Sequence, residues 1–143
     1  MENFTQRILP HELGHIIFRE FIGYKRRLPL WVDEGIVSFL EKDLKKQRLS
    51  IAKEAVKTPA FLELHELENV GMGNMSDPNL FYAEAASVFE FLFKTYGQDT
   101  FVEFCRNLKQ LRNDQGWEEA FLSAYKFKDM GEFNGKWKEF LSE

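Results

Sequence analysis

Apolar residues recur along the chain every three or four positions, the spacing that places them on one face of an α-helix. The first such segment covers residues 8–22 and is apolar nearly all round, which predicts a buried central helix. Gly23 is positioned to end it. A second helix is predicted over about 31–46 and a third over about 49–57.

The second half of the chain has the same periodicity after a loop, 69–79, that is rich in Gly, Asn, Ser and Pro and is predicted to be flexible. That loop could act as a lid or as a plain connector. Further helices are predicted over 80–96, 101–111, 115–126 and 129–142. Gly97 is predicted to end the first of these. Because no run of strand length alternates between polar and apolar residues, the predicted fold class is all-α.

Composition narrows the class of protein. The 143 residues suit a single domain, 1–143, and 15 Phe and 3 Trp are more apolar bulk than a disordered chain carries. A net charge of -4 argues against a nucleic-acid partner. No apolar run reaches the length of about 18 residues that a membrane-spanning helix needs. The single Cys105 decides no compartment, so localisation and oligomeric state stay unknown.

The candidate chemistry lies at the start of the first helix, which reads His11-Glu12-Leu13-Gly14-His15. Residues four apart lie on one face of a helix, so His11 and His15 can offer two imidazole nitrogens to one ion. Glu12 is rotated by about a third of a turn, where it can reach a water on that ion as a general base. This spacing is typical of a zinc site.

Catalytic zinc takes three protein ligands and leaves a fourth position to water. Glu34, which eighteen residues separate from His15, stands in Pro29-Leu30-Trp31-Val32-Asp33-Glu34-Gly35. A turn after the first helix and a second helix that starts near Leu30 can bring Glu34 back beside the two His. Alone, Glu34 could equally be a surface acid that the helix dipole favours.

These two motifs, with eighteen residues between His15 and Glu34, resemble those of the gluzincins, zinc peptidases with a His-Glu-x-x-His helix and a downstream Glu ligand. The likeness is greatest to peptidase-MA-like domains. In the spacing between the two motifs, the chain is also similar to the aminopeptidases whose second motif is Trp-Leu-x-Glu-Gly. The likeness covers residues 8–41, and loosely extends to about 112. The resemblance implies that His11, His15 and Glu34 bind Zn²⁺ and that Glu12 is the catalytic base.

The resemblance also carries expectations for the rest of the chain. Gluzincins place a β-sheet lobe with a substrate-holding edge strand before this helix, and nothing in the present sequence is expected to build one. The chain is therefore expected to be the helical catalytic lobe, either of a longer protein or of a reduced version. In Phe81-Tyr82-Ala83-Glu84-Ala85 the resemblance implies a Tyr82 hydroxyl that donates to the oxyanion, although a tyrosine at a helix start commonly serves packing.

Several neighbouring residues have two interpretations. Asp33 is either a first-turn acid favoured by the helix dipole or a group that orients an imidazole. Ser38 stands where some gluzincins place a carboxylate, and a hydroxyl there would orient His11 more weakly. Glu84 is a weaker candidate for contacting a substrate amine, and His65 for stabilising the oxyanion. Both are also explained as structural residues.

Each of the two motifs contains a glycine, which lowers helix stability by about 1 kcal/mol relative to Ala. Gly14 and Gly35 are therefore predicted to mark a close approach of the two metal-bearing helices. This structural interpretation is compatible with the functional one.

The predicted function is hydrolysis of peptide bonds in a peptide or protein substrate by a zinc metallopeptidase, with Glu12 as general base and Tyr82 at the oxyanion. One alternative is a non-enzymatic module with structural zinc or a lost activity, and another is an inactive fragment of a larger peptidase. Retention of Glu12 favours the enzyme, because a structural site has no use for a base. The sequence sets neither the substrate sequence nor exo- against endopeptidase action.

Overall fold

The computed structural model describes residues 9–23, 27–112 and 115–143, and within these ranges every regular element is a helix. The predicted all-α class is confirmed. No helix in the described part is long and apolar enough to cross a bilayer. In chain order the elements are α1 (Leu9–Ile22), α2 (Leu30–Leu40), the 3-10 helix η2 (Lys42–Leu44), α3 (Lys45–Ala55), α4 (Leu64–Glu68), α5 (Pro78–Gln110), α6 (Trp117–Tyr125) and α7 (Met130–Ser142).

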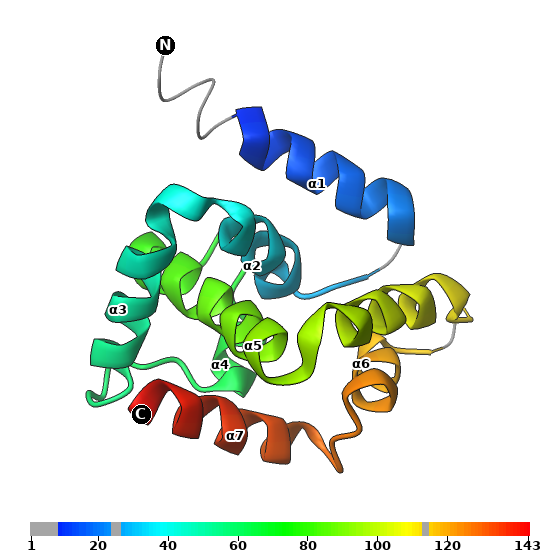
Figure 1. Ribbon diagram of the computed structural model, residues 1–143. Coiled ribbons are helices and arrows are strands. Elements are labelled where there is room, and N and C mark those ends of the chain that lie inside the picture. The colour runs from blue at the N-terminus through cyan, green and yellow to red at the C-terminus, as the bar shows by residue number, and fades with distance from the viewer. Residues whose placement is uncertain (1–8, 24–26, 113–114) are drawn as a thin grey trace.

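Helices α2 and α5 form the centre of the arrangement, with α1 across one side and α7 on the opposite side (Figure 1). Both central helices turn bulky apolar residues toward each other, and the rings of Trp31 and Phe89 lie 5.9 Å apart between centroids. Pro29 precedes α2 with a φ of -57°, which suits the entry to a helix. As a result, Glu34 is carried by the first turns of a helix whose apolar side chains are buried in the core.

Gly14 and Gly35, the glycines of the two motifs, are both sites where helices approach closely, but each meets a different helix. A Cβ atom on Gly14 would lie 3.1 Å from Val37 Cγ1, so α1 approaches α2 there, as predicted. A Cβ atom on Gly35 would lie 2.8 Å from the Ala85 carbonyl oxygen and 2.8 Å from the Phe89 ring. The prediction for Gly35 is therefore wrong in its partner, because this glycine lets α2 approach α5.

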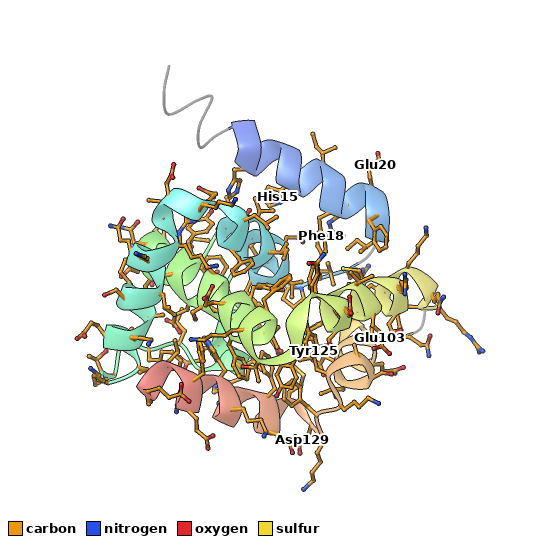
Figure 2. The ribbon with its side chains drawn as sticks, viewed as in Figure 1. His15, Phe18, Glu20, Glu103, Tyr125 and Asp129 are labelled. Atoms are coloured by element: carbon orange, nitrogen blue, oxygen red, sulfur yellow. The ribbon has the colours of Figure 1, made fainter. Side chains whose placement is uncertain are left out.

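Helix α1 is less buried than its sequence predicts. Phe18 and Ile22 are buried, but the side chains of Ile16 and Phe21 are 51% and 44% exposed. Figure 2 shows Phe18 directed toward the body of the molecule and Glu20 directed away from it. The prediction of a buried central helix is thus wrong for one face, because α1 packs against α2 and α5 from the edge of the bundle.

Helix boundaries differ from the prediction at one functionally important point. The second predicted helix, 31–46, is interrupted because Glu41 leaves the helical region, with φ -78° and ψ 90°. The chain then continues through η2 into α3. Gly23 and Gly97 have φ values of 102° and 85°, so α1 ends and α5 kinks at the predicted glycines. The predicted start of the first helix at residue 8 lies outside the described residues.

Candidate metal centre

Three side chains from α1 and α2 converge on one point. His11 and His15 project from the same face of α1, and Glu34 comes from α2. His11 Nε2 lies 3.1 Å from His15 Nε2 and 3.1 Å from Glu34 Oε2. His15 Nε2 lies 3.3 Å from the same Glu34 oxygen. The structure therefore brings together all three side chains that the sequence singles out as metal ligands.

This triangle of atoms has the dimensions that a zinc ion requires. Tetrahedral zinc with bonds of about 2.0–2.1 Å separates its ligand atoms by about 3.3–3.4 Å. The three observed separations, 3.1, 3.1 and 3.3 Å, are close to that spacing. Two imidazoles and one carboxylate are also a donor set of catalytic zinc sites, in which the fourth position takes water. The residues present thus fit zinc.

Glu41 fixes the orientation of His11, and the sequence analysis missed it. Its Oε1 atom lies 2.5 Å from His11 Nδ1. Because an ionised carboxylate only accepts hydrogen bonds, Nδ1 is the donor, and in a neutral ring the lone pair is then on Nε2, toward His15 and Glu34. The resemblance predicts this role for Ser38, but the Ser38 Oγ is buried without a hydrogen-bond partner in the described part of the chain.

Arg48, on α3, contacts both the end of α2 and the Glu41 carboxylate. Its Nη1 atom donates to the Ser38 carbonyl oxygen at 2.9 Å and lies 3.6 Å from Glu41 Oε1. The same carboxylate oxygen therefore faces His11 on one side and Arg48 on the other. The position of Glu41, seven residues or about two helical turns after Glu34, is a signal that could have found it.

A second contact ties α1 to α2 beside the cluster. Arg19, one helical turn after His15, donates to Asp33, the residue before Glu34. Burial raises the pKa of Asp33, and the hydrogen bond and charge of Arg19 partly offset that rise. Asp33 is in the first turn of α2, as expected for an acid favoured by the helix dipole, but its side chain accepts a hydrogen bond from Arg19 and not from an imidazole.

The negative charges around the cluster favour the protonated form of His11 when no cation is bound. The hydrogen bond to Glu34 raises the pKa of His11 to about 9, burial opposes the rise, and the contact with Glu41 adds to it. Burial by itself would raise the pKa of Glu34, but its hydrogen bond with His11 and the charges of His11 and His15 outweigh that and lower it. A proton on His11 and a metal ion thus compete for the same nitrogen.

The remaining predicted residues fall into two groups. Tyr82 is in the first turns of α5 and is partly buried, and its pKa is raised first by burial and then by the charge of Glu34. The phenol is therefore within electrostatic range of a proposed ligand. The side chain of Glu12 lies outside the described part of the structure, although its backbone is in α1.

Glu84 and His65 are not brought to the cluster. Glu84 is fully buried, and both of its oxygens lie 3.1 Å from the Leu62 backbone nitrogen, which donates to them. Burial raises the pKa of Glu84 to about 8. A carboxyl group enclosed in this way is not available to a substrate amine. His65 is exposed on α4 and is not part of the cluster.

Comparison with known protein families identifies a family for this chain. A family model described as the peptidase MA superfamily matches residues 2–143. No curated protein and no solved structure matches the chain. The matched range includes the His/Glu cluster and all the helices described above.

Proposed function

Since the chain belongs to the peptidase MA superfamily, we propose that it is a zinc-dependent metallopeptidase that hydrolyses peptide bonds. The observation that carries the proposal is the triangle of His11 Nε2, His15 Nε2 and Glu34 Oε2, with sides no longer than 3.3 Å. His11, His15 and Glu34 would hold the ion. When bound, zinc lowers the pKa of a water molecule and polarises a carbonyl group.

The protein's own residues have distinct roles in this proposal. Glu12, next to His11, takes a proton from the attacking water and delivers it to the leaving amine. Glu41 keeps the His11 ring turned so that Nε2 faces the cluster. Tyr82 donates a hydrogen bond to the oxygen on which negative charge develops. The charge of Glu34 raises the pKa of the Tyr82 hydroxyl, which supports a role for Tyr82 near the metal centre.

The competing function is a structural zinc module without activity. Structural zinc is usually enclosed by four Cys or His ligands. Among the residues that the structure describes, the cluster has three candidate ligands, and the side chains of His11 and His15 are 20% and 24% exposed. A three-residue, partly open donor set favours the enzyme, because water and substrate need access to the ion.

The test is hydrolysis of casein or a peptide library by the zinc-loaded protein, with Glu12→Gln as the informative variant. We expect chelator-sensitive hydrolysis that falls by a factor of about 10² to 10⁴ in Glu12→Gln, at unchanged zinc content. Glu20→Gln, the same change on the outward side of α1, is the matched control and should retain activity. Bound zinc without turnover in the wild type would favour the structural module, and an active Glu12→Gln would overturn the role of Glu12.

A further inference from the structure

A cavity lies beside the candidate metal centre. It has a volume of about 320 Å³ and opens between the η2–α3 segment and the start of α5. Its walls are formed by Leu44, Gln47, Arg48, Ile51, Asn79 and Tyr82. Two of these residues, Arg48 and Tyr82, are the ones that connect it to the cluster.

The connection to the metal centre runs through one chain of contacts and one electrostatic interaction. On one wall, Arg48 Nη1 lies 3.6 Å from Glu41 Oε1, and that oxygen lies 2.5 Å from His11 Nδ1. On the other wall, Tyr82 is close enough to Glu34 for the carboxylate charge to raise the pKa of the phenol. A group in this cavity would thus be a neighbour of a molecule at the metal centre.

The chemistry of the lining selects for an anion. Each of the four polar lining residues, Gln47, Arg48, Asn79 and Tyr82, can donate hydrogen bonds, and none of the lining residues is acidic. The surrounding segment 42–48 has four basic residues and one acidic residue, in a chain whose net charge is -4. A local basic region of this kind attracts negatively charged ligands.

Arg48 is already held in place. Its side chain is only 15% exposed, and Nη1 is fixed by the Ser38 carbonyl oxygen at 2.9 Å. The contacts with Ser38 and Glu41 are both made by Nη1, while a guanidinium has donors on its two other nitrogens as well. A planar group with its donors fixed in this way suits a carboxylate, which it can bind with two parallel hydrogen bonds.

We propose that this cavity is a substrate subsite that binds a carboxylate of the peptide, with Arg48 as the specificity-determining residue. The carboxylate can come from an Asp or Glu side chain or from a free C-terminus, since both present the same group. The inference rests on the proposed function, because it takes the molecule at the metal centre to be a peptide.

Binding of three peptides to zinc-loaded Glu12→Gln protein, measured by calorimetry, tests the subsite without cleavage. The peptides share one sequence: one has an internal Glu and an amidated end, one has Gln and a free carboxylate end, and one has Gln and an amidated end. We expect a carboxylate peptide to bind at least tenfold more tightly than the neutral one. The peptide that does so identifies the source of the carboxylate.

Asn79→Asp is the variant that tests the cavity itself. It places a carboxylate in the wall, in the first turn of α5, where the helix dipole favours an acid, and it leaves Arg48 and Glu41 in place. We expect the tenfold preference to disappear at unchanged zinc content and melting temperature. Ser123→Asp adds the same charge at an exposed position on α6 that does not line the cavity, and should keep the preference.

Equal binding of the three peptides, no binding of any of them, or a preference that survives Asn79→Asp would each overturn the subsite. Hydrolysis by zinc-loaded wild type is recorded separately. Hydrolysis without a carboxylate preference overturns the subsite alone. A carboxylate preference with no hydrolysis of any peptide overturns the proposed activity and retains the binding site.

Discussion

Glu41 Oε1 lies 2.5 Å from His11 Nδ1, across the junction between the end of α2 and the start of α1. The contact exists because the backbone leaves the helix at Glu41. It determines which nitrogen of a neutral His11 ring faces His15 and Glu34. Partners of this kind fix the ring orientation and raise the basicity of a metal-binding imidazole.

Removal of this partner should weaken zinc binding. We expect Glu41→Ala to lower zinc affinity by about 10- to 100-fold, measured by competition with a chromophoric chelator. Asp43→Ala is the matched control, because Asp43 is an exposed acid two residues away, in η2. Equal zinc affinity in Glu41→Ala and wild type would show that His11 is oriented without Glu41.

Zinc binding should release a proton. The pKa of His11 is about 9 in the absence of an ion, so at pH 7 the ring is protonated and zinc must displace that proton. Apparent affinity should therefore rise about tenfold per pH unit and level off above pH 9. Calorimetry in two buffers of different ionisation enthalpy counts the protons. Release of about one proton at pH 7 is expected, and release of none would contradict this interpretation.

The convergence of His11, His15 and Glu34 was predictable because most of it depends on local backbone conformation. The four-residue spacing of His11 and His15 places them on one helix face, and Gly23 and Pro29 limit how the chain can return Glu34. These constraints depend on backbone conformation close to each residue. The structure agrees with them in the convergence of the three side chains.

The features that the sequence did not predict are contacts between distant parts of the chain. The role of Glu41 depends on a helix break that local periodicity does not mark, and Asp33 finds Arg19 only when α1 and α2 pack together. A glycine indicates a close approach but not its partner, which is why the sequence predicts that Gly35 faces α1 whereas the structure places it against α5. An apolar residue such as Ile16 likewise does not reveal whether a neighbour covers it.

Gly35 should tolerate no side chain. A Cβ atom there would lie 2.8 Å from a backbone oxygen of α5, which cannot move aside alone. We expect Gly35→Ala to destabilise the protein by about 1–3 kcal/mol in urea unfolding and to weaken zinc binding through the adjacent Glu34. Gly135→Ala in α7 is the control, because its Cβ meets nothing within 4 Å and should gain up to about 1 kcal/mol. Equal effects of the two substitutions would contradict the close approach of α2 and α5.

The buried Glu84 makes stability depend on pH. Its folded-state pKa is about 8 and its ordinary value is 4.5, so the folded protein keeps a proton that the unfolded chain releases between these values. Stability contributed by the protonated group is complete below pH 4.5 and falls as pH rises toward 8.

Glu84→Gln, which is neutral at every pH, should therefore be more stable than wild type at pH 8, by on the order of a few kcal/mol, with the difference vanishing toward pH 4. Urea unfolding at a series of pH values measures it. Glu103→Gln, an exposed carboxyl group on the same helix, should show no comparable gain. A constant difference between Glu84→Gln and wild type across this range would contradict the raised pKa.

The most direct test of the metal centre is zinc titration by calorimetry of the wild type and Glu34→Ala, with Glu54→Ala, an exposed acid on α3, as control. The convergence of His11, His15 and Glu34 predicts one zinc ion per chain. It also predicts an affinity loss in Glu34→Ala larger than the about 100-fold upper range for an outer partner. Wild-type zinc affinity in Glu34→Ala would contradict the proposed site.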